Sequence, residues 1–309
     1  VPDSYLMLND GQGNFSTSAN FDTKMGLVYD AKFMDFDKDN DLDLIVVGHY
    51  MPISIFLNDG KGNFEKRLSE SLSNSKGWWN TMDVADYDND GDLDIVAGNW
   101  GLNTRLRASL EKPIILYRND FDGNGKVDPI VTYFYQNRET PIATKSELTK
   151  QIPVLNKNFL SYKDFAQANF EDYFSKEKIK SAEKQQVYML SSTYFENKGD
   201  FNFEATPLPW TAQISSIQAI RSMDINDDGY LDLIIGGNTY EMSTQLGRLD
   251  GSYGEILINK GGKGFVVESN KTYNIKGAVR SIENITINED QYLIFGINND
   301  SIRIVKTIK

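Results

Sequence analysis

Acidic side chains recur at alternate positions in four short segments of the chain. We call the segments 35–43, 86–94, 120–128 and 224–232 acidic loops 1 to 4. Each loop carries an oxygen-bearing side chain at positions 1, 3 and 5 and an aspartate at position 9. Side chains at alternate positions converge only where the backbone curls tightly, and converging carboxylates repel one another unless a cation lies between them. The pattern therefore predicts a hard, oxygen-binding cation in each loop, which we take to be Ca2+.

The predicted metal ligands are the side chains at positions 1, 3, 5 and 9 and the backbone carbonyl at position 7. They come from Asp35, Asp37, Asp39, Asp41 and Asp43 in loop 1, from Asp86, Asp88, Asp90, Asp92 and Asp94 in loop 2, from Asp120, Asp122, Asn124, Lys126 and Asp128 in loop 3, and from Asp224, Asn226, Asp228, Tyr230 and Asp232 in loop 4. Asn124 and Asn226 replace a carboxylate by an amide, so we expect weaker binding in loops 3 and 4. The alternative is an Asp-rich turn that is only solvated, but the fourfold repetition favours a metal. An EF-hand is disfavoured, because it needs a glutamate at position 12 and a helix on each side.

Much of the acidity of the chain is concentrated in these loops. The 309 residues have a formal net charge of −12, and the loops hold fourteen carboxylates at positions 1, 3, 5 and 9. About four structural Ca2+ ions would neutralise most of that net charge. An acidic chain argues against nucleic acid, whose binders need a basic face. No cysteine is present, which excludes disulfides and thiolate sites, and no apolar run is long enough to span a membrane.

The segments beside the acidic loops are typical of β-strands. Each loop leads into an apolar stretch, as at 42–48 and 231–236. A second phrase, an apolar strand followed by an Asn/Gly turn and an aromatic residue, predicts a β-hairpin. It recurs at 5–15, 55–64, 194–203 and 256–265. Four antiparallel strands in about fifty residues match a propeller blade. We therefore expect an all-β fold, a β-propeller of about five to seven four-stranded antiparallel blades in a closed, incomplete or fragment ring.

The array is irregular between acidic loops 2 and 4. Segment 114–120 resembles the third strand of one blade and yet leads directly into loop 3, so the sequence leaves open whether loop 3 lies on an inner or an outer hairpin. Segment 138–186 has helical character, with a capping box at 144–147. Its apolar side chains recur at helical spacing. They are Tyr162, Phe165, Ala166, Phe170, Tyr173 and Phe174. We expect a small helical insertion at 138–186 within one domain that spans 1–309.

The two ends of the chain carry parts of the same pattern. Segments 278–287, 291–296 and 301–306 read as three strands without an acidic loop. In a closed ring, the N-terminal hairpin at 5–15 would complete this last blade. Because the chain opens within the pattern, we interpret it as part of a longer chain, and the lack of a signal peptide carries little weight.

The two recurring phrases resemble the FG-GAP/VCBS repeat. The resemblance rests on D-x-D-x-D-G-x-x-D leading into L-D-L-I-V, alternating with L-N-D-G-x-G-x-F, and it covers most of the chain apart from the insertion. Related repeats form the calcium-binding β-propeller of integrin α subunits and occur in bacterial VCBS repeat-containing exported proteins. The resemblance implies a Ca2+-bearing propeller that is periplasmic, on the outer-membrane surface or extracellular, and that supports recognition. Asn40 departs from the usual glycine at position 6, which is tolerable because asparagine adopts the left-handed conformation.

Long loops follow the apolar strands, and blade topology places them on the face opposite the acidic loops. Function tends to lie on long loops of a rigid scaffold, and aromatic side chains beside amides and charges suit a sugar or a peptide. We expect a glycan or protein ligand at the cell envelope to bind there. The candidate ligand-binding residues are Tyr50, Trp100, Asn103, Arg105, Tyr135, Arg138, Tyr240, Glu241, Arg248 and Asp250. The alternative is that these aromatic side chains plug the funnel and pack against the insertion.

No catalytic constellation is legible in the chain. His49 is the only histidine, and a lone histidine has many structural explanations. Paired carboxylates for glycoside hydrolysis stay open, because acidic residues are abundant. We predict a binding module, with a polysaccharide lyase or hydrolase and a structural spacer as alternatives. An enzyme predicts charged groups converging in a deep pocket near Tyr135, Tyr240 and Arg248, a binder predicts a shallow aromatic platform, and a spacer predicts a sealed funnel.

Overall fold

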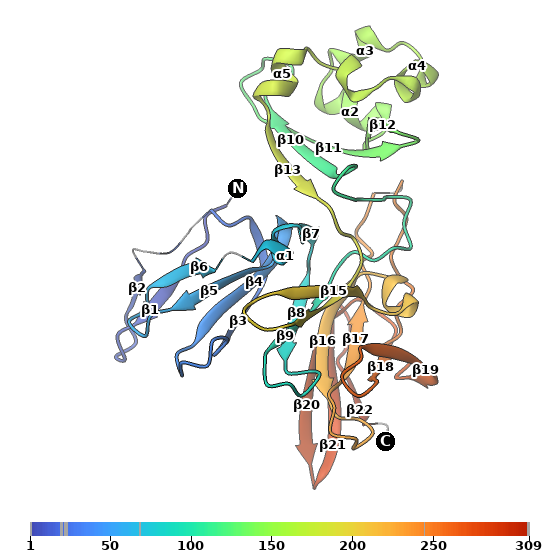
Figure 1. The fold of residues 1–309 in the computed structure, drawn as a ribbon. Helices are drawn as coiled ribbons and strands as arrows, with labels where there is room; N and C mark the ends of the chain where they lie inside the picture. Colours follow the sequence, from blue (N-terminus) through green and yellow to red (C-terminus); the bar gives the residue numbers. More distant parts are fainter. Residues whose placement is uncertain (1, 19–20, 22–23, 68, 244, 308–309) are drawn as a thin grey trace. The chain divides into compact units, whose positions relative to one another are not determined.

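The structure is a computed structural model that describes residues 2–18, 21, 24–67, 69–243 and 245–307. It consists mainly of antiparallel sheets with few helices, which confirms the all-β class (Figure 1). The chain forms two compact units. Unit 1 comprises Val1–Asn103 and Leu190–Lys309, and unit 2 comprises Thr104–Met189. Within the described residues, no helix has the length and apolar character needed to cross a membrane.

Three sheets of unit 1 repeat one plan, in which an acidic loop joins the first two strands and an Asn/Gly turn joins the last two. Sheet 1 contains β3 (Leu27–Met34), β4 (Asp43–Met51), β5 (Ser54–Asn58) and β6 (Phe64–Arg67), sheet 2 contains β8 (Thr81–Ala85), β9 (Asp94–Gly98), β14 (Thr193–Asn197) and β15 (Phe203–Pro207), and sheet 3 contains β16 (Ile217–Met223), β17 (Asp232–Gly237), β18 (Glu255–Asn259) and β19 (Phe265–Thr272). Short elements connect them: α1 (Glu70–Ser73), β7 (Gly77–Trp78), which pairs with β4, and η2 (Trp210–Gln213). The four-stranded unit expected from the sequence is therefore present.

The remaining strands of unit 1 lie at its sequence ends. Sheet 4 has the order β20 (Val279–Ile287), β21 (Asp290–Ile297), β22 (Arg303–Lys306). The N-terminal hairpin, β1 (Met7–Asn9) and β2 (Phe15–Thr17), forms a separate two-stranded sheet. Because β1 and β2 pair only with each other among the described strands, the hairpin does not complete this last sheet as expected. It lies instead near the β5–β6 turn, where a Cβ added to Gly62 would be 3.7 Å from Leu8.

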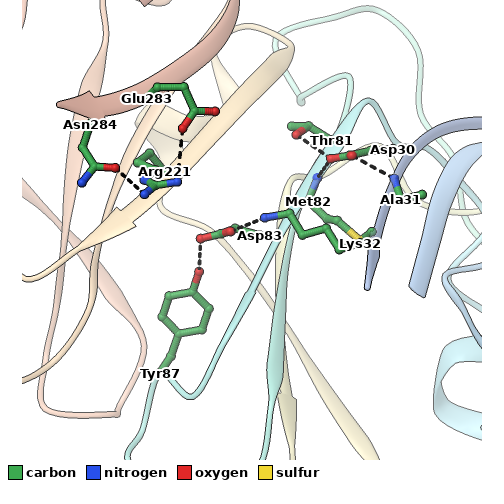
Figure 2. Close-up of polar contacts among 10 residues, drawn as sticks. All are labelled: Asp30, Ala31, Lys32, Thr81, Met82, Asp83, Tyr87, Arg221, Glu283 and Asn284. Atoms are coloured by element: carbon green, nitrogen blue, oxygen red, sulfur yellow. Dashed lines mark hydrogen bonds and ion pairs between the residues drawn. The ribbon is translucent and has the colours of Figure 1, made fainter. Parts of the chain in front are cut away.

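The first strands of the four sheets follow one another in space in the order β3, β8, β16, β20. Polar side chains bridge them, as Figure 2 shows: Lys32 on β3 pairs with Asp83 on β8, and Arg221 on β16 pairs with Glu283 on β20. Asp83 also accepts the Tyr87 hydroxyl at 3.0 Å, so this buried carboxylate is compensated on both sides. The consecutive array is what a propeller requires, and closure into a ring stays a prediction.

Apolar side chains fill the spaces between neighbouring sheets of unit 1. Val96 and Tyr194 of sheet 2 share a core cluster with Leu233 and Ile235 of sheet 3, and a second cluster joins sheet 3 to sheet 4. Strands that are buried on both faces read as continuous apolar runs, as the stretches after the acidic loops do. Burial of these strands fixes the roots of the loops that follow them.

Unit 2 is a four-stranded sheet covered by short helices (Figure 1). Its sheet has the order β12 (Arg138–Pro141), β11 (Asp128–Tyr135), β10 (Ile114–Asn119), β13 (Glu183–Val187), and its helices are α2 (Lys145–Gln151), α3 (Leu155–Asn158), α4 (Tyr162–Gln167), η1 (Phe170–Asp172) and α5 (Lys176–Ser181). The predicted capping box begins α2, where Thr144 and Glu147 bond each other's backbone. Phe165, Phe170 and Tyr173 are buried, whereas Tyr162 and Ala166 are exposed, because the chain turns after α4 instead of continuing one helix.

The compact unit is larger than the helical segment expected at 138–186. The helices lie within that range, but unit 2 extends over 104–189 and includes its own sheet, with acidic loop 3 between β10 and β11. Loop 3 therefore lies on neither hairpin of sheet 2. Sheet 2 is completed across the insertion, where β14 pairs with β9 through Tyr194 and Val96. No local signal marks such a pairing, because its two strands are far apart in the sequence.

Candidate metal centres and ligand surface

All four acidic loops have the same tight curl. Positions 4 and 6 have positive φ angles in each loop, for example 64° at Lys38 and 73° at Asn40 in loop 1. The aspartate at position 1 accepts the backbone N–H of position 6, at 3.1 Å from Asn40, 2.9 Å from Gly91, 2.8 Å from Gly125 and 2.8 Å from Gly229. Asn40 adopts the left-handed conformation expected of it, since asparagine tolerates this region better than most residues.

The curl brings carboxylates together as the sequence predicts. Among the described residues, three groups of three acidic side chains place a ligand oxygen each within 4.8 Å of the others. The groups are Asp35, Asp37 and Asp39 in loop 1, Asp86, Asp88 and Asp90 in loop 2, and Asp120, Asp122 and Asp128 in loop 3. Loops 1 and 2 thus use positions 1, 3 and 5, whereas loop 3, which has Asn124 at position 5, uses position 9.

Loop 4 differs because its position 3 is an amide. Asn226 donates its side-chain N–H to the Asp228 carboxylate at 3.0 Å and accepts the Asp228 backbone N–H at 3.1 Å. The amide therefore replaces a repulsive pair of carboxylates by a hydrogen bond. It also leaves one formal charge fewer for a cation, in line with the weaker binding expected in this loop.

The environment of loop 2 fits a cation. One oxygen of Asp86, Oδ1, is buried and has no hydrogen-bond partner in the described structure. Burial raises the pKa of Asp88 to about 6 and that of Asp94 to about 6, and neighbouring carboxylates add to both effects. An orphaned buried oxygen among carboxylates that resist ionisation is a donor set that a divalent cation would satisfy.

The aspartate at position 9 connects each loop of unit 1 to the following hairpin. Asp43, Asp94 and Asp232 are buried, and in each the Oδ2 atom accepts the backbone N–H of position 2 at 2.8–3.0 Å. The Oδ1 atom accepts the backbone N–H of an asparagine that ends the third strand. These asparagines are Asn58 at 2.8 Å, Asn197 at 2.7 Å and Asn259 at 2.8 Å.

The same asparagine also bonds through its side chain. The amide N–H of Asn58, Asn197 or Asn259 donates to the backbone carbonyl at position 8 of the loop, at 3.1, 3.4 and 3.1 Å respectively. We call this double contact, from an asparagine to positions 8 and 9, the asparagine latch. The asparagine latch connects the acidic loop to the hairpin, the two patterns that recur separately in the sequence. The asparagine present in every hairpin pattern is the sequence feature that could have indicated this contact.

Neighbouring acidic loops of unit 1 also contact one another through position 4. Lys38 of loop 1 pairs with Asp92 of loop 2 at 2.7 Å, and Asn89 of loop 2 donates to the Gly229 carbonyl of loop 4 at 3.1 Å. The Asp92 side chain at position 7 of loop 2 therefore contacts the preceding loop 1.

The predicted ligand-binding residues fall into separate places. Tyr240 and Glu241 line a hollow of about 390 Å³, and Tyr240, Arg248 and Asp250 line a second hollow of about 140 Å³. The Arg248 guanidinium lies over the Tyr240 ring, 4.2 Å from its centre. The two hollows share Tyr240, so the structure brings four of the predicted residues to one surface, which we call the Tyr240 surface.

A buried asparagine and a backbone bridge hold the loop that carries Tyr240. Thr239 and Leu249 exchange two backbone hydrogen bonds, at 2.8 and 3.0 Å, which brings Arg248 back beside Tyr240. Asn238 has φ of 81° and donates to the carbonyls of Ser252 and Gly277, both at 2.9 Å. Because Asn238 is buried and fully bonded, the Tyr240 surface rests on a rigid base.

Sequence reasoning missed several residues of this surface. Arg280 and Asp300 line the larger hollow and Lys276 lines the smaller one. Arg280 donates to the Asn238 carbonyl at 3.0 Å, and partial burial lowers its pKa. Arg280 lies at the start of β20, Lys276 just before that strand and Asp300 between β21 and β22, and none of them belongs to a motif, so only their spatial position reveals them.

The other predicted ligand-binding residues of unit 1 lie elsewhere. Tyr50, Trp78 and Trp100 form an aromatic cluster, with ring centres 6.0 and 5.0 Å apart, and burial raises the pKa of Tyr50 to about 12. His49 stacks on Tyr29 at 4.0 Å. Tyr50 and Trp100 are half-buried in this cluster. Asn103 is exposed and lines a different hollow with the exposed Trp210.

Three predicted ligand-binding residues belong to unit 2. Arg105 lies over the Tyr133 ring at 5.3 Å, and Arg138 donates to the Gln167 carbonyl at 3.0 Å. Both arginines thus have contacts within their own unit. Tyr135 is exposed at the end of β11.

Comparisons with known proteins bear on part of the chain. A family model described as an FG-GAP-like repeat matches residues 35–97. This segment holds acidic loops 1 and 2 and the hairpin between them, so these three elements lie within an FG-GAP-like repeat. No curated protein matches the chain.

The chain is weakly similar to two solved structures. One is a lectin of Agrocybe aegerita that recognises non-reducing terminal N-acetylglucosamine, with 14% identity, a TM-score of 0.30 and coverage of 98% of this chain and 74% of the lectin. The other is a biofilm matrix protein of V. cholerae, with 10% identity, a TM-score of 0.27 and coverage of 100% of this chain and 69% of that protein. At these TM-scores, neither likeness carries an argument about this chain.

Proposed function

We propose that the chain is a calcium-stabilised recognition module that binds a glycan at the Tyr240 surface. The observation that carries the proposal is the pair of adjoining hollows that share Tyr240 and are lined by alternating acidic, basic and amide side chains. The base of the loop that carries Tyr240 is tied by the Thr239–Leu249 bridge and by the hydrogen bonds of Asn238, which lowers the entropy cost of binding. The scaffold and the ligand surface have separate roles in this proposal.

The chemistry of the Tyr240 surface favours a sugar over a strongly charged ligand. Its hollows contain three acidic and three basic side chains, so their formal charges balance. They are Glu241, Asp250, Asp300, Arg248, Lys276 and Arg280. A sugar presents hydroxyl groups that donate and accept hydrogen bonds, together with an apolar face that stacks on an aromatic ring. The Tyr240 ring with charged groups of both signs around it meets both requirements.

The acidic loops have a structural role in this proposal. Ca2+ would be held by the side chains at positions 1, 3, 5 and 9 of the four loops, with three carboxylates in loops 3 and 4 and four in loops 1 and 2. Each ion would neutralise a loop whose position-9 aspartate ties two hairpins together, so ion binding would add to the free energy of unfolding. Extracellular Ca2+ is about millimolar and would fill even weak sites of this kind. We therefore propose an exported protein, at the cell envelope or beyond it.

The metal proposal is tested by chelation. We expect EDTA to lower the melting temperature of the protein by several degrees, and added Ca2+ to restore it, because each occupied site stabilises only the folded state. Differential scanning calorimetry measures both steps, with Mg2+ as the control ion. An unchanged melting temperature after complete chelation would rule out structural ions.

The ligand proposal is tested on a glycan array that displays neutral and acidic oligosaccharides. We expect the wild-type protein to bind a defined subset of glycans, and Tyr240→Ala to weaken that binding at least about tenfold, because aromatic contacts dominate such sites. Tyr162→Ala, which removes an exposed tyrosine from unit 2 that is not among the candidate ligand-binding residues, is the matched control and should bind as the wild type does. Melting temperatures of both variants separate lost binding from lost folding. Equal losses in both variants, or no glycan bound by the wild type, would contradict the assignment.

A further inference from the structure

The N-terminal hairpin β1–β2 has the sequence of an outer blade hairpin but lacks the inner strands of one. Its phrase at 5–15 matches those at 55–64, 194–203 and 256–265. In the other three, the first strand of the hairpin pairs on both edges: β5 with β4 and β6, β14 with β9 and β15, and β18 with β17 and β19. Among the described strands, β1 pairs with β2 alone. One edge of β1 therefore has unpaired backbone N–H and C=O groups. In β5, β14 and β18, the same edge pairs with an inner strand.

The side chain at the matching position gives the same contrast. Met7 corresponds to Phe56, Phe195 and Leu257, counted from the asparagine of each turn. Those three side chains are 1%, 1% and 0% exposed, whereas Met7 is 48% exposed. Met7 therefore exposes apolar surface that the equivalent position of each other hairpin buries.

The asparagine latch is preformed in the hairpin but lacks its aspartate. Asn9 corresponds to Asn58, and its side-chain oxygen accepts the Gly11 N–H at 2.9 Å, as that of Asn58 accepts the Gly60 N–H at 3.2 Å. Asn9 pairs with Phe15 in the same register as Asn58 with Phe64. In the described part of the chain, however, no acidic loop bonds the backbone or side-chain N–H of Asn9. The β1–β2 turn thus has the geometry that accepts a position-9 aspartate in the other hairpins, and the acidic loops of the described chain do not supply that aspartate.

We propose that the free edge of β1 docks a strand–acidic loop–strand segment that lies outside these 309 residues, and that the hairpin is the outer half of a further four-stranded sheet. The docked segment places an aspartate on the backbone N–H of Asn9, a backbone carbonyl on its side-chain N–H and an apolar strand over Met7. These are the three contacts made by every equivalent hairpin of unit 1. The docking is independent of the Tyr240 surface and of its ligand.

A second copy of this chain does not supply the occupant. The position-9 aspartates of loops 1, 2 and 4 are engaged by their own asparagine latches, and Asp128 of loop 3 contacts Gln151. The strands that follow the loops, β4, β9, β17 and β11, are already paired on both edges. A second copy would therefore have to open one of its own sheets to dock, so the occupant is an additional FG-GAP-like segment.

A peptide titration tests the docking. The probe is a fluorescent synthetic peptide with the sequence of residues 79–98, which contains β8, acidic loop 2 and β9, added to the intact protein in Ca2+ buffer. We expect saturable binding by fluorescence anisotropy and slower hydrogen exchange at residues 7–9. Met7→Asp should weaken binding at least about tenfold, because a buried apolar contact is lost. Asn9→Ala keeps its backbone N–H but loses the side-chain bond of the latch, and should weaken binding about fivefold. No binding up to roughly 1 mM peptide would overturn the proposal.

Matched controls keep the test specific to the latch. Asn14→Ala removes a hydrogen bond to Asp10 inside the same turn, on the strand away from the free edge, and should leave binding unchanged. A peptide with Asp94→Ala should bind at least about tenfold more weakly than the parent peptide. Equal binding of both peptides, or of Asn9→Ala and wild-type protein, would overturn the proposal. So would a dimer in sedimentation that Met7→Asp abolishes, because the occupant would then be a second copy.

Discussion

Acidic loops 1, 2 and 4 of unit 1 and acidic loop 3 of unit 2 have one sequence pattern and one curl, yet they are closed by different partners. In unit 1, the position-9 aspartate accepts the N–H of a hairpin asparagine at 2.7–2.8 Å. In unit 2, Asp128 has a weaker contact with the Gln151 amide of α2, at 3.4 Å. The curl is thus a local property of nine residues, whereas the closing contact depends on what the rest of the chain packs beside the loop.

The electrostatic setting differs in the same way. In loop 2, burial raises the pKa of Asp88 and Asp94 to about 6 each. In loop 3, backbone N–H donors led by Gly125 lower the pKa of Asp120, and Lys178 from α5 donates to its backbone carbonyl. Loop 3 therefore has compensating donors and a nearby cationic side chain, while loop 2 has buried carboxylates that depend more on an ion. We infer that Ca2+ contributes more to unit 1 than to unit 2.

Replacing the position-9 aspartate should give the largest difference in stability between loop 2 of unit 1 and loop 3 of unit 2. Asp94 accepts hydrogen bonds from the Tyr87 and Asn197 backbones and from the Tyr194 hydroxyl. Asp94→Ala leaves these buried donors unsatisfied, and we expect it to lower the free energy of unfolding by about 3–5 kcal/mol. Asp128→Ala should cost about 1–2 kcal/mol. Urea unfolding followed by hydrogen exchange of each unit measures both, and equal losses would refute the distinction between the two closures.

Replacing the residue that bonds the loop near that aspartate should have a smaller effect on stability, and the effect should again be larger in unit 1 than in unit 2. Asn197→Ala keeps its backbone N–H but loses two side-chain bonds at a buried position, to the Leu93 carbonyl at 3.4 Å and from the Gly199 N–H at 3.1 Å, and we expect a loss of about 1 kcal/mol. Gln151→Ala loses only contacts of 3.3–3.4 Å and should change the free energy of unfolding by less than about 0.5 kcal/mol. The melting temperatures of the two variants give the comparison. A larger loss for Gln151→Ala would show that α2 closes its loop as tightly as a hairpin does.

Restoring the missing carboxylate should give the smallest effect, and its sign should depend on the metal. Asn226→Asp removes the bond to Asp228 and adds a repulsive charge, so we expect it to destabilise the protein by about 1 kcal/mol in EDTA. In millimolar Ca2+ the same change should stabilise the protein, because the added charge strengthens the site. Asn124→Asp gives the matched change in unit 2. The same sign in both buffers would argue against an ion in loop 4.

The sequence predicted the local elements well and the long-range pairings poorly. The acidic loops, the Asn/Gly hairpins and the capping box at Thr144 are signalled by adjacent residues, and each occurs in the structure. The insertion was expected at 138–186 but forms a unit over 104–189. Its sheet escaped notice because β10 resembles an ordinary blade strand, whereas β12 and most of β13 fall within the segment that was expected to be helical. The placement of the N-terminal hairpin failed because strand type alone does not specify a partner.

The ligand surface shows the same limit. Tyr240, Glu241, Arg248 and Asp250 were identifiable as polar and aromatic residues in one long loop, and they share one surface. Tyr50 and Trp100 have the same composition signal but pack with Trp78. An aromatic residue in a loop can pack in the core or lie on a binding surface. Which of the two occurs depends on the sheets that pack beside the loop.

The sequence alone determined the repeated unit, the curl of each acidic loop and the convergence of its oxygens, because these depend on backbone preferences and side chains within nine residues. Only the tertiary structure decided which hairpin or helix closes each loop, that acidic loop 3 belongs to an inserted unit, and that one hairpin lacks its inner strands. These outcomes depend on pairing between strands that are distant in sequence, where many partners have the same local pattern. The asparagine latch depends on both the sequence and the tertiary structure. Its residues can be recognised in the sequence, but their contacts appear only in the folded protein.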